Sequence, residues 1–297
     1  MIWSFSALFF SAAARRVGAS PVNLIRLVAA TVLLATMVVV SGVASRPPAA
    51  QVVLLALSGV VGLALGDAAW FRALRILGAR RSSLVSPLWP VFSAMAAFPL
   101  LGEVVGPLDL LGMAAALGGV LWVQGGGDPG SEVEGSFRRG LLFGVLACLG
   151  QAVGYVLAKP GLGVVPPGSF LGDIVGPSPV PVDPLFGTLI RMSAGTAWVL
   201  ASETLRGGFV ESRAALGDRR GVWLILGGTV SGPVLGVWMS LVALRYAGNT
   251  AIASTLLAMS PLFVIPLVRV VYGTPITLRA VVGSVIAIGG VALLTLG

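Results

Sequence analysis

Runs of apolar residues, broken by proline, glycine or arginine, make up most of the chain, and polar residues fall mainly between them. A helix that crosses a bilayer needs about 20 consecutive apolar residues. Runs of about this length predict ten membrane-spanning helices, at residues 1–15, 21–44, 50–77, 82–102, 107–124, 139–159, 184–204, 221–246, 249–271 and 276–296. The pattern therefore predicts an all-α integral membrane protein. The first run is short, which leaves open a short helix or a start codon upstream of Met1.

Two of the breaks between the runs are longer than the others. The stretch "GGGDPGSEVEGSFRR" (125–139) is polar, glycine-rich and acidic, which is typical of a linker. Residues 160–183 are rich in proline and cannot hold a helix for long. We expect an ordered extramembrane loop there, with disorder as the alternative. The chain then divides into a first unit at 1–124, a linker at 125–138 and a second unit at 139–297.

An internal repeat relates the two units. The segment "LGDAAWFRALRILG" (65–78) aligns with "LGVWMSLVALRYAG" (235–248). Upstream, "NLIRLVAATVLL" resembles "TLIRMSAGTAWVL", which pairs Arg26 with Arg191. Each unit then holds five spans, and an odd number of spans forces the second unit to be inverted relative to the first.

The segments "IRLVAATVLL", "GDAAWFRALRILGARRSSLVSPLWPVFSAMAAFPLLGE" and "LLGMAAALGGVLW" resemble the EamA branch of the drug/metabolite transporter superfamily, and the resemblance covers nearly the whole chain. The resemblance implies ten transmembrane helices as two inverted five-helix repeats, with a central cavity formed mainly by spans 1, 3, 4 and 6 with 8 and 9. It also implies alternating-access movement of small metabolites, often as export. The chain departs from the pattern in its short first span, its proline-rich insert, and Thr274 at the position that matches Glu103, so no paired acidic role is expected for Glu103.

Composition agrees with lipid as the solvent for much of the chain. Charged residues are 10% of the sequence and hydrophobic residues 57%, whereas an ordinary soluble domain carries about 25% charged residues. The formal net charge is +8, but the arginines gather at the ends of apolar runs. Lipid headgroups and membrane topology explain that placement better than nucleic acid does. We therefore expect a multi-pass protein of the cell (plasma or inner) membrane, with a small-molecule substrate and membrane lipids as partners, as a monomer or weak dimer.

The chain lacks the side chains that most enzymes of the membrane interior need. It has no histidine, and its single cysteine, Cys148, excludes an intramolecular disulfide. It also lacks HExxH and DxxD motifs, so metal catalysis is not expected and no cofactor, metal or catalytic residue is predicted. The alternatives to a transporter are an intramembrane lipid-phosphate-processing enzyme and a membrane scaffold. The inverted repeat favours the transporter, because such symmetry supplies two access states.

Depth along each span separates structural charges from candidate functional ones. Arg72 lies about 30 Å of helix beyond Val52, so it belongs to an interfacial group with Arg75, Arg80 and Arg81. The same count places Glu103, Lys159 and Arg269 near the ends of their spans. Three charges remain inside the membrane: Arg26, Asp67 and Arg191.

Arg26 and Asp67 lie at similar depth on antiparallel spans, near the same membrane face. A lone charge there costs a few kcal/mol, and an opposite charge removes most of that cost. We therefore predict an Arg26–Asp67 pair. Its role is either a structural staple or a gate that lines the cavity.

The second unit keeps Arg191 but has Val237 where Asp67 would be. Lys159, at the end of span 6, is expected on the same membrane face as Arg191. Two cations without a buried acid predict a seat for a carboxylate or phosphate group of a substrate. The alternative is that Asp173 or Asp183, in the adjoining loop, neutralises them.

Further polar and aromatic side chains are candidates for the cavity lining. Gln151, Tyr155 and Lys159 follow one another at i, i+4 spacing on span 6, and such a polar stripe is wasteful against lipid. Asp67 and Trp70 share a helical face. The other aromatic candidates are Trp89 and Trp238, and the residues predicted to bend helices near the cavity are Pro87, Pro90, Pro233 and Pro261.

Charge bias and family resemblance predict opposite orientations. All Lys and Arg residues except Arg46, Lys159, Arg191 and Arg245 lie on loops after odd-numbered spans or on helix ends beside those loops. The positive-inside rule places that face in the cytoplasm and both termini outside. The resemblance implies cytoplasmic termini. We give the charge bias more weight.

Overall fold

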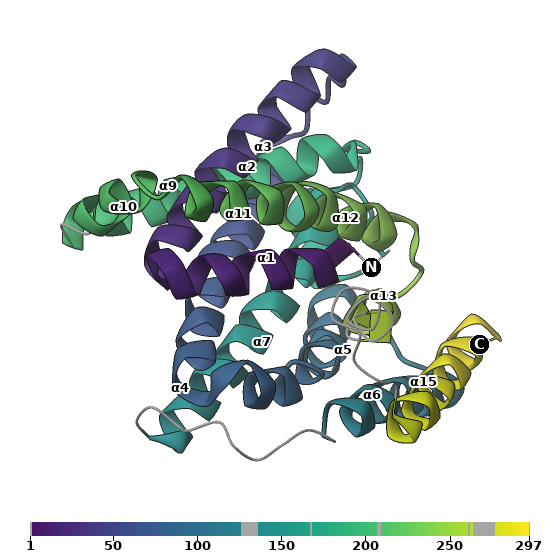
Figure 1. Ribbon diagram of the computed structural model, residues 1–297. Coiled ribbons are helices and arrows are strands. Elements are labelled where there is room, and N and C mark those ends of the chain that lie inside the picture. Colours follow the sequence, from purple (N-terminus) through teal and green to yellow (C-terminus); the bar gives the residue numbers. More distant parts are fainter. Residues whose placement is uncertain are drawn as a thin grey trace.

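The computed structural model describes residues 2–125, 136–166, 168–206, 209–260, 262–263 and 277–296, and these residues form helices and no strands (Figure 1). The first half contains α1 (Ile2–Val17), α2 (Ala19–Ser41), α3 (Ala49–Ser58), η1 (Gly59–Gly66), α4 (Asp67–Val85), α5 (Leu88–Leu101) and α6 (Pro107–Gln124). The second half contains α7 (Phe137–Gly161), α8 (Phe170–Val175), α9 (Pro184–Arg206), α10 (Phe209–Leu216), α11 (Arg219–Thr229), η2 (Val230–Gly236), α12 (Val237–Tyr246), α13 (Thr250–Ala258) and α15 (Leu278–Leu296).

Within the described residues, seven helical segments are long and apolar enough to cross a membrane: Ala19–Ser41, Ala49–Gly78, Arg81–Leu101, Pro107–Gln124, Phe137–Gly161, Arg219–Tyr246 and Leu278–Thr295. Each coincides with one of the apolar runs. α1 has only 16 residues, and α9 has 23 residues but carries Arg191 in its first half. The run expected at 249–271 is described only in part, as α13, and residues 264–271, including Arg269, lie outside the described residues.

Two π-helices interrupt the α-helical spans at positions that the sequence repeat aligns. η1 joins α3 to α4 and ends at Gly66, and η2 joins α11 to α12 and ends at Gly236, its partner in the alignment. Close backbone packing accompanies η1, because a Cβ on Gly150 of α7 would lie 2.9 Å from Cα of Gly66. The wide turn of a π-helix shifts the side chains that follow it, and such turns are frequent at functional sites.

Helices that are distant in sequence pack as neighbours. α7 runs along α3, η1 and α4, while α1 runs along α11 and η2, and α2 lies against α9. α6 and α15 lie side by side at the edge of the molecule (Figure 1). Small residues permit that contact, since a Cβ on Gly119 would come within 2.5 Å of the Gly283 carbonyl oxygen.

The predicted helix-bending prolines occupy helix starts and a π-helix. Ser86 and Pro87 form the turn between α4 and α5, and Pro90 lies in the first turn of α5, where the missing N–H costs little. The sequence had predicted that Pro87 and Pro90 bend a helix. They instead stand at the start of one, so that prediction was wrong for these two prolines. Pro233 lies inside η2. Pro261 lies outside the described residues.

The sharpest break in a span occurs at a glycine. Gly78 has φ 77° and ψ 164°, which divides α4 into two helices. Only glycine adopts such a conformation without strain. The second part of α4 then leads into the next span.

The proline-rich segment 160–183 folds back over the end of α7. It contains α8, and Val182 donates its N–H to the Leu162 carbonyl at 3.1 Å. Buried Gln51 of α3 pairs with the Val180 backbone in both directions, at 2.8 and 3.0 Å. These bonds hold the segment across the end of the bundle.

Candidate functional site

Arg191 is the most deeply buried arginine side chain among the described residues, with 1% of its surface exposed. It lies about 10 Å of helix beyond the start of α9. Neither its Nε nor its Nη1 has a hydrogen-bond partner among the described residues. A buried guanidinium normally satisfies its donors with carboxylates, carbonyls or phosphates. Arg191 therefore presents a positive charge and free donors inside the protein.

Aromatic rings line one side of Arg191. Its Cζ atom lies 5.2 Å from the centroid of the Tyr155 ring, a cation–π arrangement. The Trp89 ring also packs against the Tyr155 ring, with ring centroids 5.2 Å apart. The Tyr155 hydroxyl also interacts with Ser240 of α12. Tyr155 of α7 thus connects the Arg191 guanidinium of α9 to side chains of α5 and α12.

Glycines of η1 permit the approach of α9. A Cβ on Gly59 would overlap the carbonyl oxygen of Arg191, and a Cβ on Gly62 would lie 3.4 Å from its Nη2. The π-helix therefore leaves room for the Arg191 backbone and head group.

A second charged cluster is centred on Asp67, the residue that directly follows η1. Nη2 of Arg26 lies 2.5 Å from Oδ2 of Asp67, and it also donates to Oδ1 of Asn23 at 2.8 Å. Gln151 of α7 donates to Oδ1 of Asp67 at 2.9 Å. The Arg26 head group lies over the Phe71 ring at 5.2 Å. Arg26 and Asp67 are thus paired, as depth along the spans predicted, within a four-residue network.

Lys159 belongs to a third cluster, and this corrects the predicted two-cation seat. Its Nζ lies 2.6 Å from Oε1 of Glu103 and donates to the Gly248 carbonyl at 3.0 Å. The Thr250 backbone N–H donates to Oε2 of Glu103 at 2.6 Å. Glu103 is buried near the end of its span, and it neutralises Lys159 in place of Asp173 or Asp183. Of the two cations of the predicted seat, Arg191 is the one without a recorded acid partner among the described residues.

The predicted stripe on α7 faces the interior, but its members serve different clusters. Gln151 binds Asp67, Tyr155 faces Arg191, and Lys159 binds Glu103. Trp238 is half-buried and packs on the apolar core around Met192, the neighbour of Arg191. Trp70 is half-buried on α4 and is not brought to Arg191 by any recorded contact.

The sequence indicates some members of these clusters and gives no indication of others. Asn23 is three residues before Arg26, a spacing that places both on one helical face. The Glu103–Thr250 contact joins residues 147 positions apart, and no local pattern indicates it. Among the described residues, no three metal-ligating side chains come together, and the interior polar groups around Arg191 suit an anion.

The apolar helices and the buried charges between them agree with the comparison to known families. The model of the EamA-like transporter family matches residues 1–124 and 179–296. The chain belongs to the EamA-like transporter family. EamA-like proteins are membrane transporters of the drug/metabolite type, so this chain is a multi-pass membrane protein.

A solved structure shares the fold of this EamA-like chain. The crystal structure of a protein superposes with a TM-score of 0.72 at 16% sequence identity, and the match covers 99% of this chain and 93% of that chain. At that identity the similarity concerns the fold alone. No curated protein matches the sequence.

Proposed function

We propose that this EamA-like protein is a secondary transporter of the cell membrane, an exporter or exchanger of small amphipathic metabolites that carry an anionic group, such as amino acids or related compounds. Its ten spans form two inverted five-helix units and work by alternating access. The observation that carries the proposal is the buried Arg191 with two free donor atoms. A carboxylate or phosphate provides the acceptors that this guanidinium lacks.

The repeat itself supports an anion at Arg191. Arg26 and Arg191 are aligned, and Arg26 is neutralised by Asp67. The residue aligned with Asp67 is Val237, which is apolar and buried. A substrate carboxylate at Arg191 supplies the charge that the second unit lacks. Tyr155 and Trp89 provide an aromatic wall for the apolar part of the same molecule.

The buried charges favour exchange over net transport. Arg26, Lys159 and Arg191 are the cations of the three clusters, and Asp67 and Glu103 are the acids. Among the described residues, the three clusters of the empty protein therefore carry one uncompensated positive charge, which a monoanionic substrate neutralises. An unpaired charge inside the bilayer costs a few kcal/mol, so the loaded protein reorients faster than the empty one.

The two ion pairs are suited to gating on opposite sides of the Arg191 site. Glu103–Lys159 joins the ends of α5 and α7 to the start of α13, and Arg26–Asp67 joins α2 to α4. Breaking one pair while the other persists opens the site to one face at a time. This is the requirement of alternating access.

The test is transport by purified protein in proteoliposomes. Thermal-shift screening of amino acids and small carboxylates identifies a ligand, because a ligand that binds the native state raises apparent stability. We expect Arg191→Gln to abolish uptake of that ligand while the melting temperature without ligand is kept. Arg138→Gln, an exposed arginine at the start of α7, is the matched control and should transport normally.

Two further measurements separate the parts of the proposal. Uptake into liposomes loaded with the same ligand should exceed uptake into empty liposomes by roughly tenfold or more, since 1.4 kcal/mol corresponds to tenfold in rate. Equal rates would exclude the exchange mechanism and leave the binding site intact. Normal uptake by Arg191→Gln would exclude Arg191 as the anion seat.

A further inference from the structure

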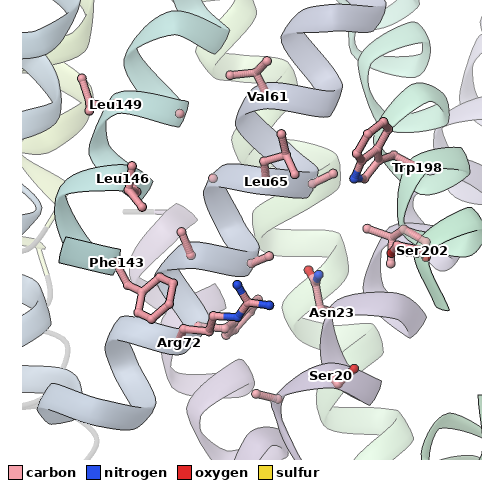
Figure 2. Close-up of a pocket in the computed structure, with 18 of the residues that line it drawn as sticks. Ser20, Asn23, Val61, Leu65, Arg72, Phe143, Leu146, Leu149, Trp198 and Ser202 are labelled. Atoms are coloured by element: carbon pink, nitrogen blue, oxygen red, sulfur yellow. Dashed lines mark hydrogen bonds between the residues drawn. The ribbon is translucent and has the colours of Figure 1, made fainter. Parts of the chain in front are cut away.

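A lateral groove of about 750 Å³ lies between α7 and α9, beside the start of α2, and its floor is formed by η1 and the first part of α4. Figure 2 shows Phe143, Leu146 and Leu149 of α7 on one wall and Trp198 and Ser202 of α9 on the other. The residues of these two side walls belong to none of the three clusters described above, which are centred on Arg191, on Arg26–Asp67 and on Glu103–Lys159. The groove is therefore a second candidate site.

Polarity in the groove is ordered along its length. Arg72, Asn23 and Ser20 gather at one end, and Val61 and Leu65 line the other end (Figure 2). Arg72 follows Val61 by about 16 Å of helix. The apolar end is open to the surroundings, because Leu65 and Trp198 are each 48% exposed. Because depth along its span makes Arg72 interfacial, we expect the polar end at the membrane face and the apolar end toward the bilayer centre.

Charges of both signs line the polar end without neutralising one another. Arg72 and Arg75 both line the groove, and so does Glu203. Among the described residues, neither arginine forms an ion pair with an acid, and Arg72 instead lies over the Phe143 ring at 5.4 Å. Within the part of the chain that the structure describes, the one recorded hydrogen bond to Glu203 comes from Ser20 and is long, at 3.5 Å. Both signs of charge thus remain available to a ligand.

We infer that this groove binds one phospholipid with a phosphoethanolamine headgroup. Its phosphate lies at Arg72 and Arg75, its ammonium at Glu203, and one acyl chain along Leu65 and Trp198. A groove that is cationic and anionic at the membrane face and apolar at depth matches a zwitterionic lipid in both charge and position. A glycerol headgroup has no ammonium, so it leaves Glu203 without a partner.

The experiment is native mass spectrometry of the delipidated, full-length protein titrated with palmitoyl-oleoyl phosphatidylethanolamine or phosphatidylglycerol. We expect one ethanolamine lipid to bind the unmodified protein more tightly than the glycerol lipid. Arg72→Gln and Arg75→Gln should each weaken binding roughly fivefold, the effect of one arginine at a lipid surface. Glu203→Gln should abolish the preference for ethanolamine.

Arg139→Gln is the matched control, because Arg139 is exposed at the start of α7 and does not line the groove. It should bind the ethanolamine lipid as tightly as the unmodified protein. The thermal melting curve in detergent establishes that each variant is folded. If Arg72→Gln does not fold, Arg75→Gln alone tests the phosphate site. Undiminished binding by the folded arginine variants would contradict the proposed binding site. A preference for the glycerol lipid would contradict the proposed ethanolamine headgroup.

Discussion

The Arg26 guanidinium lies 2.5 Å from the Asp67 carboxylate and so joins α2 to the residue that directly follows η1. Asp67 also accepts from Gln151 of α7, so three spans depend on one acid. The aligned arginine of the second unit, Arg191, has no acid in the corresponding place. This difference between two otherwise similar units is the basis of the proposed substrate site.

Arg26→Gln and Asp67→Asn are each expected to destabilise the protein by about 3 kcal/mol, because each leaves a largely buried charge without its partner. The double variant should recover much of that loss, since no lone charge remains. Chemical denaturation in detergent micelles measures the three values. If the double variant loses as much as the sum of the single ones, the two residues do not stabilise each other.

The Glu103–Lys159 pair should behave in the same way with a larger single effect at Glu103. Glu103→Gln leaves Lys159 charged in the interior and also weakens the acceptor of the Thr250 N–H and hydroxyl. We expect a loss of about 3–5 kcal/mol. Thr250→Ala removes one of these hydrogen bonds and should cost only about 1 kcal/mol. Equal losses would indicate that burial of the Lys159 charge is not the main effect.

Gly59→Ala is expected to disrupt the contact between η1 and α9, because the new Cβ would overlap the Arg191 carbonyl oxygen. The helices would have to separate at the proposed site, so both melting temperature and transport should fall. Gly118→Ala is the matched control, since Gly118 has no atom within 4 Å of an added Cβ. It should be neutral or slightly stabilising, as expected for glycine replacement in a helix. Equal effects of the two substitutions would contradict the close packing at Gly59.

Stability should also depend on pH through a surface pair outside the membrane. A hydrogen bond from the Arg16 side chain, together with the Gly221 N–H, lowers the pKa of Asp218 below its usual range. Because the pKa is lowered in the folded state, this stabilisation is present above the unfolded pKa of about 3.9. It is lost as pH falls through the lower, folded value.

The melting temperature of the unmodified protein should therefore fall between pH 5 and pH 3 more steeply than that of Asp218→Asn. Asparagine still accepts the Gly221 N–H as a helix cap, so the comparison isolates the charge. Arg16→Gln should flatten the same part of the curve. An unchanged pH profile in both variants would show that the pair does not contribute.

Membrane orientation can be determined with single cysteines placed in the 125–139 linker of a Cys148→Ala background. Cys148 is buried, so its removal leaves only the introduced thiol to react. The excess of arginine on the face that holds this linker predicts that the linker is cytoplasmic. A membrane-impermeant thiol reagent should then fail to label intact cells and should label lysed ones. Labelling of intact cells would instead support cytoplasmic termini, as the family resemblance implies.

The amino-acid sequence alone determined the features that depend on local composition and on depth. Apolar runs predicted each of the seven spans because a bilayer requires about 20 apolar residues in a row. Counting residues from the span ends placed Arg26 and Asp67 at one level, and the cost of an unpaired charge then predicted their contact. The inward direction of Gln151, Tyr155 and Lys159 followed from their spacing on one helix.

Among the described residues, the tertiary structure decided which cation of the three buried clusters remains without an acid. Lys159 and Glu103 are 56 residues apart in sequence and meet only because α5, α7 and the start of α13 converge. The π-helix η1 could not be predicted from the sequence either, because it occurs where the backbone packs closely against α7 and α9. Both features depend on contacts between distant segments, whereas sequence periodicity reports only which side of one helix a residue occupies. Tertiary packing therefore neutralised Lys159 and left Arg191 with free donors.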